Sequence, residues 1–492
     1  MDGIEDFFST LTFEEIFLSA TITVILSVLM GGLFLKSRRS NIARKQELES
    51  REIEVTQKKQ AEEARAKKRV DGECLVDDRS LMIGDIEVLD PEAPTKHFLI
   101  AATIGAGKSQ TLHTMLDRVF WGVDKRPSSE KAIITDPSGE FLASRGSETD
   151  LILNPFDKRS LSWSPFNEIV DESDWEMVAR AIMPDSPIPS KQEWVGYGRN
   201  FLIDIMKSLH AVGNHNIREV SRLITQASQE ELCDYLAGTS SELLVAPGGD
   251  NLLKSVRFEA VDGIRAWSHL QPTGDFSIRK WINEGKGTIF ITYSDSQVDS
   301  MIPLIRAWLS LGIRQTLSLE PDFNRRVWFV MDEFDSLGRV DYIKEALSRG
   351  RKYGLCAIGV IQSLAQLEAG YGHDIAKVLR SVFVNKLIMT QGSAYDGEEW
   401  SREIGEFYKE EVNSSTGHGP GGETSGSTTS IQVRRIVTGT DLMNLQPGVG
   451  YALIRTKPGG LKSRLLNGVN FFRCAFHAYP KKIQAFIDKK KV

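Results

Sequence analysis

The stretch Ala102-Thr103-Ile104-Gly105-Ala106-Gly107-Lys108-Ser109 decides the fold of this chain. It follows the apolar run Phe98-Leu99-Ile100-Ala101, which predicts a buried strand, and it precedes a helical pattern from Gln110 to Trp121. A glycine loop between a strand and a helix lets backbone N–H groups surround phosphate oxygens, and the helix presents its positive end to the same charge. The stretch therefore predicts a phosphate-binding loop; the alternative is a small-residue turn at a helix start.

The last residues of this loop carry the expected chemistry. Lys108 is expected to reach the β- and γ-phosphates of a nucleotide, and the Ser109 hydroxyl is expected to bind Mg²⁺. We therefore expect ATP and Mg²⁺ as ligands, with nucleotide contacts from consecutive residues of the loop: Thr103, Ile104, Gly105, Ala106, Gly107, Lys108, Ser109 and Gln110.

A second motif, far along the chain, supports a nucleotide site. The apolar run over residues 326–331 predicts a strand, and this strand ends in Asp332 and Glu333. Asp332 is expected to order Mg²⁺ through its water shell, and Glu333 is expected to orient and help deprotonate the attacking water. A strand that ends at an acidic turn is the alternative. The presence of two such motifs, each at a strand end, argues against it.

Two further polar residues are candidates for the same site. A helix predicted over residues 340–352 ends in a basic cluster, Arg349, Arg351 and Lys352. Cations favour a helix C-terminus and Gly354 suits the cap, so a purely structural role is one interpretation of this cluster. The next predicted strand, residues 355–361, ends at Gln362. An amide there, level with the loop and with Asp332, is expected to sense the γ-phosphate.

The alternation of strands and helices predicts an α/β fold with a doubly wound parallel sheet. Further strands are expected over residues 131–136, 287–292, 382–389 and 451–454. Residues 173–268 look helical throughout, and we expect them to form an all-α domain inserted into a nucleotide-binding domain, which consists of residues 72–172 and 269–492. Residues 413–430 are rich in Gly, Ser and Thr and are expected to form a mobile loop.

The N-terminal region predicts a membrane anchor. Residues 16–35 form an uncharged, mostly apolar run that is long enough to cross a bilayer as a helix. A cleaved signal peptide would begin with a basic segment, whereas this run follows acidic residues and precedes basic ones. We therefore expect residues 1–40 to anchor the chain by a single pass in the inner membrane, with the bulk of the chain in the cytoplasm. Residues 41–71, which are charged and free of Gly and Pro, are expected to form a helical linker.

Length, charge and cysteine usage limit the remaining possibilities. With 492 residues, the chain is too long for a single hydrophobic core, and two soluble domains are expected. The formal net charge of −6 gives no bulk argument for nucleic-acid binding, so any basic surface must be local. Neither a structural zinc site nor a disulfide framework is expected, because the cysteines lie far apart in the sequence: Cys74, Cys233, Cys356 and Cys474.

These residues resemble those of the type IV coupling proteins of bacterial conjugation. The resemblance rests on four segments: residues 102–109, 136–141 and 163–167, and above all the block from Asp332 through Gly354 to Leu367. It implies a membrane-anchored homo-hexameric ATPase with a RecA-like core. Such a protein recruits a relaxase bound to single-stranded DNA, as part of a relaxosome, and helps to move this cargo through a type IV secretion channel.

The resemblance also implies roles for single residues. Lys108 and Ser109 match the phosphate and Mg²⁺ ligands, and Asp332 and Glu333 match the Walker B pair. Arg351 matches the arginine finger of the family, and Gln362 its γ-phosphate sensor. The chain departs from many members in having one predicted membrane helix rather than two. Two alternatives to a DNA motor stay open: an ATP-gated docking hub that selects protein substrates for secretion, and a DNA pump of the FtsK type.

Overall fold

The computed structural model describes residues 81–120, 130–147, 149–419, 422–456, 461–462, 464–466, 469–476, 484–485 and 487. All of them belong to one unit, Asp78–Val492. The predicted anchor (residues 16–35) and the predicted linker (residues 41–71) lie outside the described residues. Within the described part, no helix is both long enough and apolar enough to cross a membrane.

A ten-stranded sheet organises the unit, in the order β14-β15-β12-β9-β3-β8-β7-β4-β6-β5. The strands from β9 to β5 are parallel, whereas β12, β15 and β14 add an antiparallel edge. Their bounds are β3 (Phe98–Ala101), β4 (Glu130–Pro137), β5 (Leu151–Ile152), β6 (Gly287–Tyr293), β7 (Arg326–Met331), β8 (Leu355–Ile361), β9 (Asn385–Ile388), β12 (Val449–Leu453), β14 (Arg464–Leu466) and β15 (Val469–Arg473). The predicted strands are confirmed, except that residues 382–384 precede β9.

Each face of the sheet carries its own core, because successive side chains of a strand point to opposite faces. On one face, Phe98 and Ile100 of β3 join the buried side chains of α3 (Lys108–Phe120) and α4 (Glu140–Arg145). On the other face, Leu99 and Ala101 belong to a larger core that includes α11 (Val298–Leu317). Strands covered on both faces read as continuous apolar runs, which is why the sequence locates them so well. The predicted α/β fold is confirmed.

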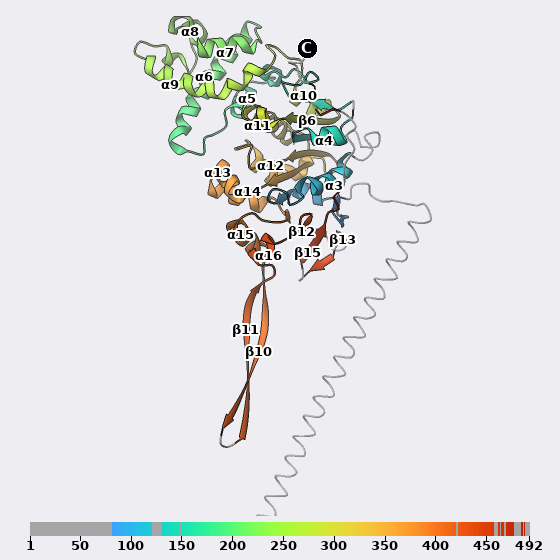
Figure 1. Cartoon of the computed structure of the whole chain (residues 1–492). Coiled ribbons are helices and arrows are strands. Elements are labelled where there is room, and N and C mark those ends of the chain that lie inside the picture. Colours follow the sequence, from blue (N-terminus) through green and yellow to red (C-terminus); the bar gives the residue numbers. More distant parts are fainter. Residues whose placement is uncertain are drawn as a thin grey trace, which may run out of the picture. The chain divides into compact units, whose positions relative to one another are not determined.

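The chain between β5 and β6 is helical in all its regular elements, apart from isolated bridges such as that between Trp163 and Phe276. The helices are α5 (Asp174–Ile182), α6 (Pro189–Ala211), α7 (Ile217–Thr225), α8 (Gln229–Leu236), α9 (Asp250–Ile264) and α10 (Ile278–Glu284). Figure 1 shows α6 to α9 grouped beside one another at one end of this unit. Their apolar side chains share the larger core with the sheet. The predicted helices are therefore present, and residues 173–268 as a separate domain stay a prediction.

A mobile loop was expected over residues 413–430, but residues 413–419 and 422–430 belong to a β-hairpin (Figure 1). Strands β10 (Glu406–Gly419) and β11 (Gly422–Arg435) pair antiparallel along their whole length and form a sheet of their own. The loop prediction was wrong because it weighed only the small, polar composition. A ladder of two strands satisfies backbone N–H and C=O groups whatever the side chains are, and threonine favours strands.

The helix predicted over residues 340–352 is shorter than expected. Tyr342 has a φ of +62°, so α12 (Ile343–Arg349) begins only after it. The basic cluster then continues into a 3₁₀ helix, η6 (Gly350–Tyr353). Gly354 caps η6 with a φ of +78°, as predicted for a C-terminal glycine. Its N–H donates to the carbonyl oxygens of Arg351 and Gly350.

His97, immediately before β3, is buried and links three neighbouring strands. Its Nδ1 accepts a hydrogen bond from the Ala357 N–H of β8 at 3.2 Å, and its carbonyl accepts one from the Asn385 N–H of β9 at 3.1 Å. Its φ is +60°, an uncommon value for a residue with a side chain. Burial lowers the pKa of His97 from 6.5 to about 4. The imidazole is therefore neutral in the folded chain at physiological pH.

We expect this histidine to make the fold acid-sensitive. Between pH 6.5 and about 4, His97 takes up a proton only on unfolding, so the stability that it contributes at neutral pH is lost as the pH falls. The loss amounts to about 3 kcal/mol in the free energy of unfolding. His97→Asn keeps an acceptor near Ala357 and tolerates the positive φ, and should remove this dependence. Urea denaturation at several pH values measures it, with the exposed His373→Asn as control. If the free energy of unfolding depends on pH in the same way for wild type and His97→Asn, His97 is not the source of the acid sensitivity.

Candidate active site

The loop between β3 and α3 is held at the carboxyl edge of the sheet. The Ala102 N–H is donated to the Ile361 carbonyl at 3.1 Å, and the Thr103 N–H to the Thr390 carbonyl at 2.9 Å. Gly105 and Gly107 have φ values of +76° and +97°. These values favour glycine and turn the backbone of the loop into a cradle in which successive N–H groups can converge.

Lys108, the first residue of α3, faces a group of carboxylates from another part of the chain. Burial lowers the pKa of Lys108, and the negative charges of Asp332, Asp335 and Glu333 oppose this effect. Strand β8 lies between β3 and β7, and these three parallel strands end at the same edge of the sheet. The fold therefore brings together the two motifs that the sequence placed far apart.

Asp332 and Glu333 follow β7 at this edge. Burial raises the pKa of Asp332 to about 6, with a further contribution from Glu333. The Glu333 N–H is donated to Asp332 Oδ1 at 3.1 Å, and Thr135 Oγ1 donates to the Asp332 carbonyl at 3.1 Å. Glu333 has a φ of +55°, a strained value for this residue type. Such backbone strain is typical of functional positions, and here it fixes the direction of the Glu333 side chain.

Gln362 belongs to the same cluster. Its Nε2 donates to Glu333 Oε1 at 3.4 Å, a long hydrogen bond. Its backbone N–H is donated to Asp335 Oδ2 at 2.8 Å, and the Ser363 N–H to the same oxygen at 3.2 Å. Asp335 thus ties the segment after β7 to the segment after β8. The sequence did not identify Asp335 as a site residue, because it does not directly follow a strand. It lies three residues after Asp332.

Asp136, at the end of β4, is a second carboxylate that sequence reasoning missed. It is fully buried, and it accepts hydrogen bonds from the Phe141 N–H at 3.1 Å and the Leu142 N–H at 2.7 Å. Burial raises its pKa to about 7. Its hydrogen bonds hold the start of α4 against the carboxyl edge. The signal in the sequence was the same as for Asp332, a buried strand that ends in an aspartate.

Arg351 does not join this cluster. It lies in η6, before the start of β8, whereas Gln362 follows the end of the same strand. Seven residues of β8 separate the two ends, which is about 20 Å at roughly 3.3 Å per residue. The Arg351 guanidinium contacts Glu92 Oε2 at 2.8 Å. Four of the five proposed catalytic residues are therefore brought together, and the fifth lies at the opposite edge of the sheet.

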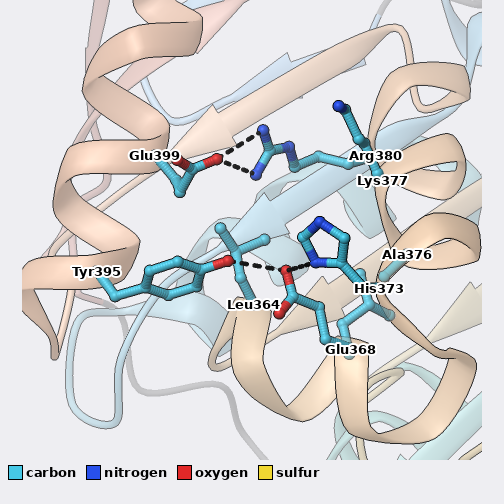
Figure 2. Close-up of a pocket in the computed structure, with 9 residues that line it drawn as sticks. Leu364, Glu368, His373, Ala376, Lys377, Arg380, Tyr395 and Glu399 are labelled. Atoms are coloured by element: carbon cyan, nitrogen blue, oxygen red, sulfur yellow. Dashed lines mark hydrogen bonds and ion pairs between the residues drawn. The ribbon is translucent and has the colours of Figure 1, made fainter.

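A cavity of about 320 Å³ lies outside this cluster, among α13 (Leu364–Tyr371), α14 (His373–Val382) and α15 (Ala394–Ile404). Figure 2 shows that its carboxylates point at donors of the same cavity. Glu368 accepts from the Tyr395 hydroxyl at 2.9 Å, and Arg380 contacts Glu399 at 3.1 Å through both terminal nitrogens. Because these charges compensate one another, the residues after β3, β7 and β8 remain the stronger candidate site.

Known proteins with a similar sequence point to one family. Residues 80–458 match the family described as "Type IV secretion-system coupling protein DNA-binding domain". Coupling protein TraD of Escherichia coli K12 is 29% identical over 393 residues, which cover 77% of this chain and 52% of TraD. The type IV secretion system-coupling protein VirD4 of Bartonella henselae is 31% identical over 96 residues, or 20% of this chain and 15% of VirD4. The chain thus spans about half the length of TraD and a smaller part of VirD4.

Solved structures of TrwB share the fold. The unbound conjugative coupling protein TrwBdeltaN70 superposes with a TM-score of 0.73 at 28% identity, over 83% of this chain and 91% of that one. TrwB in complex with ADP and Mg²⁺ gives a TM-score of 0.70 at 28% identity, over 81% and 89% of the two chains. The family match includes the glycine loop, the carboxylates after β7 and Gln362. This chain therefore belongs to the type IV secretion-system coupling proteins, as its sequence predicted.

Proposed function

We propose that this coupling protein hydrolyses ATP at the loop between β3 and α3, and that hydrolysis drives DNA transfer during conjugation. In this proposal it receives single-stranded DNA bound to a relaxase and passes the cargo to a type IV secretion channel. The observation that carries the enzymatic part is the position of Lys108. Lys108 directly follows the glycine cradle, and the negative charges of Asp332, Asp335 and Glu333 act on its ammonium group.

The residues of this site fit a nucleotide with Mg²⁺. In the proposal, Lys108 and the loop N–H groups hold the phosphates, and the Ser109 hydroxyl and Asp332 hold the metal. Mg²⁺, when bound, supplies charge neutralisation at the phosphates. Glu333 orients the attacking water. Gln362 Nε2 donates a hydrogen bond to Glu333 Oε1 at 3.4 Å. Solved TrwB structures hold ADP with Mg²⁺ and non-hydrolysable analogues of ATP and GTP, which supports this choice of ligand.

We further propose that the sheet domain is a RecA-like core that assembles into a homo-hexamer, with residues 173–268 as an inserted all-α domain. Two features support a ring. Lys108 is the cation that acts on the pKa of Asp332, Glu333 and Asp335, and Arg351 lies at the other edge of the sheet with its side chain half exposed. An arginine in that position can act on the phosphates of a neighbouring subunit.

The membrane anchor is part of the same proposal, with residues 16–35 as a single span of the inner membrane and the bulk of the chain in the cytoplasm. A fragment that begins after about Val70 should be soluble and should keep its affinity for ATP, because all the proposed nucleotide contacts follow it in the sequence. Flotation with lipid vesicles measures the first property and nucleotide titration the second. A fragment that still floats with the lipid would show that the anchor extends beyond these residues.

DNA binding is expected to be independent of base sequence and strongly dependent on salt. A protein that passes any sequence can hold only the phosphates and the faces of the bases. With about six phosphates contacted, affinity for single-stranded DNA should fall by about 10²-fold to 10³-fold between roughly 50 mM and 200 mM salt. Fluorescence anisotropy with labelled oligonucleotides of different sequence measures both effects. Binding that ignores ionic strength, or that requires one sequence, would contradict the proposal.

The rate of ATP hydrolysis with and without DNA separates the motor from its main alternative. A motor that moves DNA should hydrolyse ATP faster when single-stranded DNA is bound. A docking hub that selects protein substrates should hydrolyse ATP at the same rate with or without DNA. The measurement uses the full chain in a mild detergent, because the proposed membrane anchor is part of that chain.

A further inference from the structure

A second cavity, of about 310 Å³, lies where the helical region meets the sheet domain. Its walls come from the connection between α5 and α6, the first turns of α6, the end of α9, and α11 together with residues 338–339. We call it the Arg306 cavity, after the side chain of α11 that lines it. None of its residues belongs to the candidate active site.

Arg306 is a partly buried cation for which the described residues provide no hydrogen bond and no ion pair. Its Nε is fully buried and lacks an acceptor. Its guanidinium lies against the backbone of the next wall, since a Cβ built on Gly338 would be 3.6 Å from Arg306 Nη1. Burial lowers the pKa of Arg306, and the negative charge of Asp262 opposes this effect only in part. A buried N–H donor without an acceptor, such as Arg306 Nε, is costly. The cavity is therefore suited to a ligand that accepts hydrogen bonds and is negatively charged.

The other charged residues of the cavity favour the same class of ligand. Lys191, Arg265 and Arg339 also line it. Of the carboxylates that line it, Asp185 is already contacted by three guanidinium groups, and Asp262 lies 3.8 Å from the guanidinium of Arg265. Glu259 lines the cavity as well. A phosphate offers the planar fork of an arginine several oxygens at once, and suits this wall better than a single carboxylate does.

Exposed aromatic side chains lie beside the cavity. Trp194 and Tyr197 of α6 are 38% and 43% exposed, and their ring centroids are 6.0 Å apart. Lys191 and Val195 of the same helical turns line the cavity. Exposed aromatic faces next to cations are the combination that holds single-stranded nucleic acid, because bases stack on the rings while the cations contact phosphates.

The cavity is also connected to the candidate active site. Gly338 and Arg339 follow Asp335 by only three and four residues. Asp335 accepts the backbone hydrogen bonds of Gln362 and Ser363. One short segment therefore joins the carboxylates after β7 to the wall of the Arg306 cavity.

We propose that the Arg306 cavity binds a phosphate group of single-stranded DNA, with a neighbouring base stacked on Trp194. This inference rests on the proposed function, because it specifies where the transferred strand contacts the chain. It assigns the strand to the junction between the helical region and the sheet domain. Arg306 supplies the fork for the phosphate and Lys191 supplies further positive charge, whereas Arg265 and Arg339 also contact carboxylates.

One substitution tests the phosphate contact and another tests the base stacking, and they differ in their expected effect on the salt dependence of binding. Arg306→Gln should weaken binding of a labelled oligothymidine to the full chain about tenfold, and should lower the slope of log affinity against log salt by about 0.7, the value for one lost phosphate contact. Trp194→Ala should weaken binding by a similar factor while leaving the slope unchanged, because stacking releases no counterions. Trp194→Phe should restore most of the affinity. Lys377→Gln, an exposed lysine of the cavity in Figure 2, is the matched control and should change neither quantity.

Further outcomes of these measurements distinguish a DNA site from a site for a free anion or for an acidic protein segment. If wild type and both variants bind the oligonucleotide with equal affinity and equal slope, the cavity is not a DNA site, although the proposed function stands. If the wild-type chain does not bind DNA at all, the proposed function itself fails. Inorganic phosphate at constant ionic strength should displace the oligonucleotide only weakly; displacement at low phosphate concentration would assign the cavity to a free anion. If Arg306→Gln loses binding to oligoglutamate and not to DNA, an acidic protein segment is the occupant and the proposal is wrong. Unchanged nucleotide affinity checks that each variant is folded.

Discussion

Replacing Arg351 with alanine is expected to leave ATP binding intact and to lower ATP turnover by about 10³-fold to 10⁵-fold. The reason is geometric. Arg351 lies at the opposite end of β8 from Gln362, so it cannot reach the phosphates held by Lys108 of its own chain. Its pairing with Glu92 involves side chains that are 51% and 37% exposed. Such a pair contributes at most about 1 kcal/mol, so the guanidinium is readily exchanged onto a neighbour's nucleotide.

A mixed-ring experiment shows whether Arg351 acts between subunits. Arg351→Ala supplies intact loops and Lys108→Ala supplies intact arginines, so rings that contain both should recover part of the activity that each lacks alone. Arg349→Ala is the matched control, because this exposed arginine lies on the same basic segment, two residues earlier, and should keep near-normal turnover. No recovery in rings shown to be mixed would count against a shared site. Near-normal turnover by Arg351→Ala alone would leave only the structural role at the end of η6.

The second large effect is expected for Lys108→Ala, which should lower ATP turnover by at least about 10²-fold to 10³-fold and weaken ATP binding. Lys108 is the one cation that the structure places against the carboxylates of Asp332, Glu333 and Asp335 within the described cluster. The fold should tolerate the change. Lys108 belongs to neither hydrophobic core, so its removal takes away no apolar packing.

Steady-state hydrolysis and titration with a fluorescent ATP analogue measure these two losses, and thermal unfolding checks the fold. Lys377→Ala is the control for the loss of an exposed lysine outside the site, and should hydrolyse ATP at the wild-type rate. A well-folded Lys108→Ala protein that turns over ATP at the wild-type rate would overturn the assignment of the loop. The same outcome would remove the basis of the mixed-ring experiment.

The sequence by itself determined the parts of this protein that depend on local order. A strand buried on both faces must be apolar throughout, so β3, β7 and β8 are visible as runs within a residue of their observed bounds. The glycines of the loop and the two carboxylates after β7 must stand at fixed offsets from these strands. Since such offsets are properties of the chain alone, the family and most of the candidate site followed from them.

Only the tertiary structure decided which distant groups meet. Asp335 became a link because β7 and β8 are neighbours in the sheet, and nothing in its local sequence shows that Gln362 donates to it. Arg351 lies away from the other candidates because it precedes β8, whereas Gln362 follows the same strand. The two ends of β8 are about 20 Å apart at roughly 3.3 Å per residue. The hairpin of β10 and β11 depends on the pairing of two polar segments, which composition does not reveal. Arg306 looks like an ordinary residue of a helix, and it became a candidate phosphate ligand because three separate segments enclose it without supplying an acceptor. Contacts of this kind depend on the packing of elements far apart in the chain, and no local pattern encodes them.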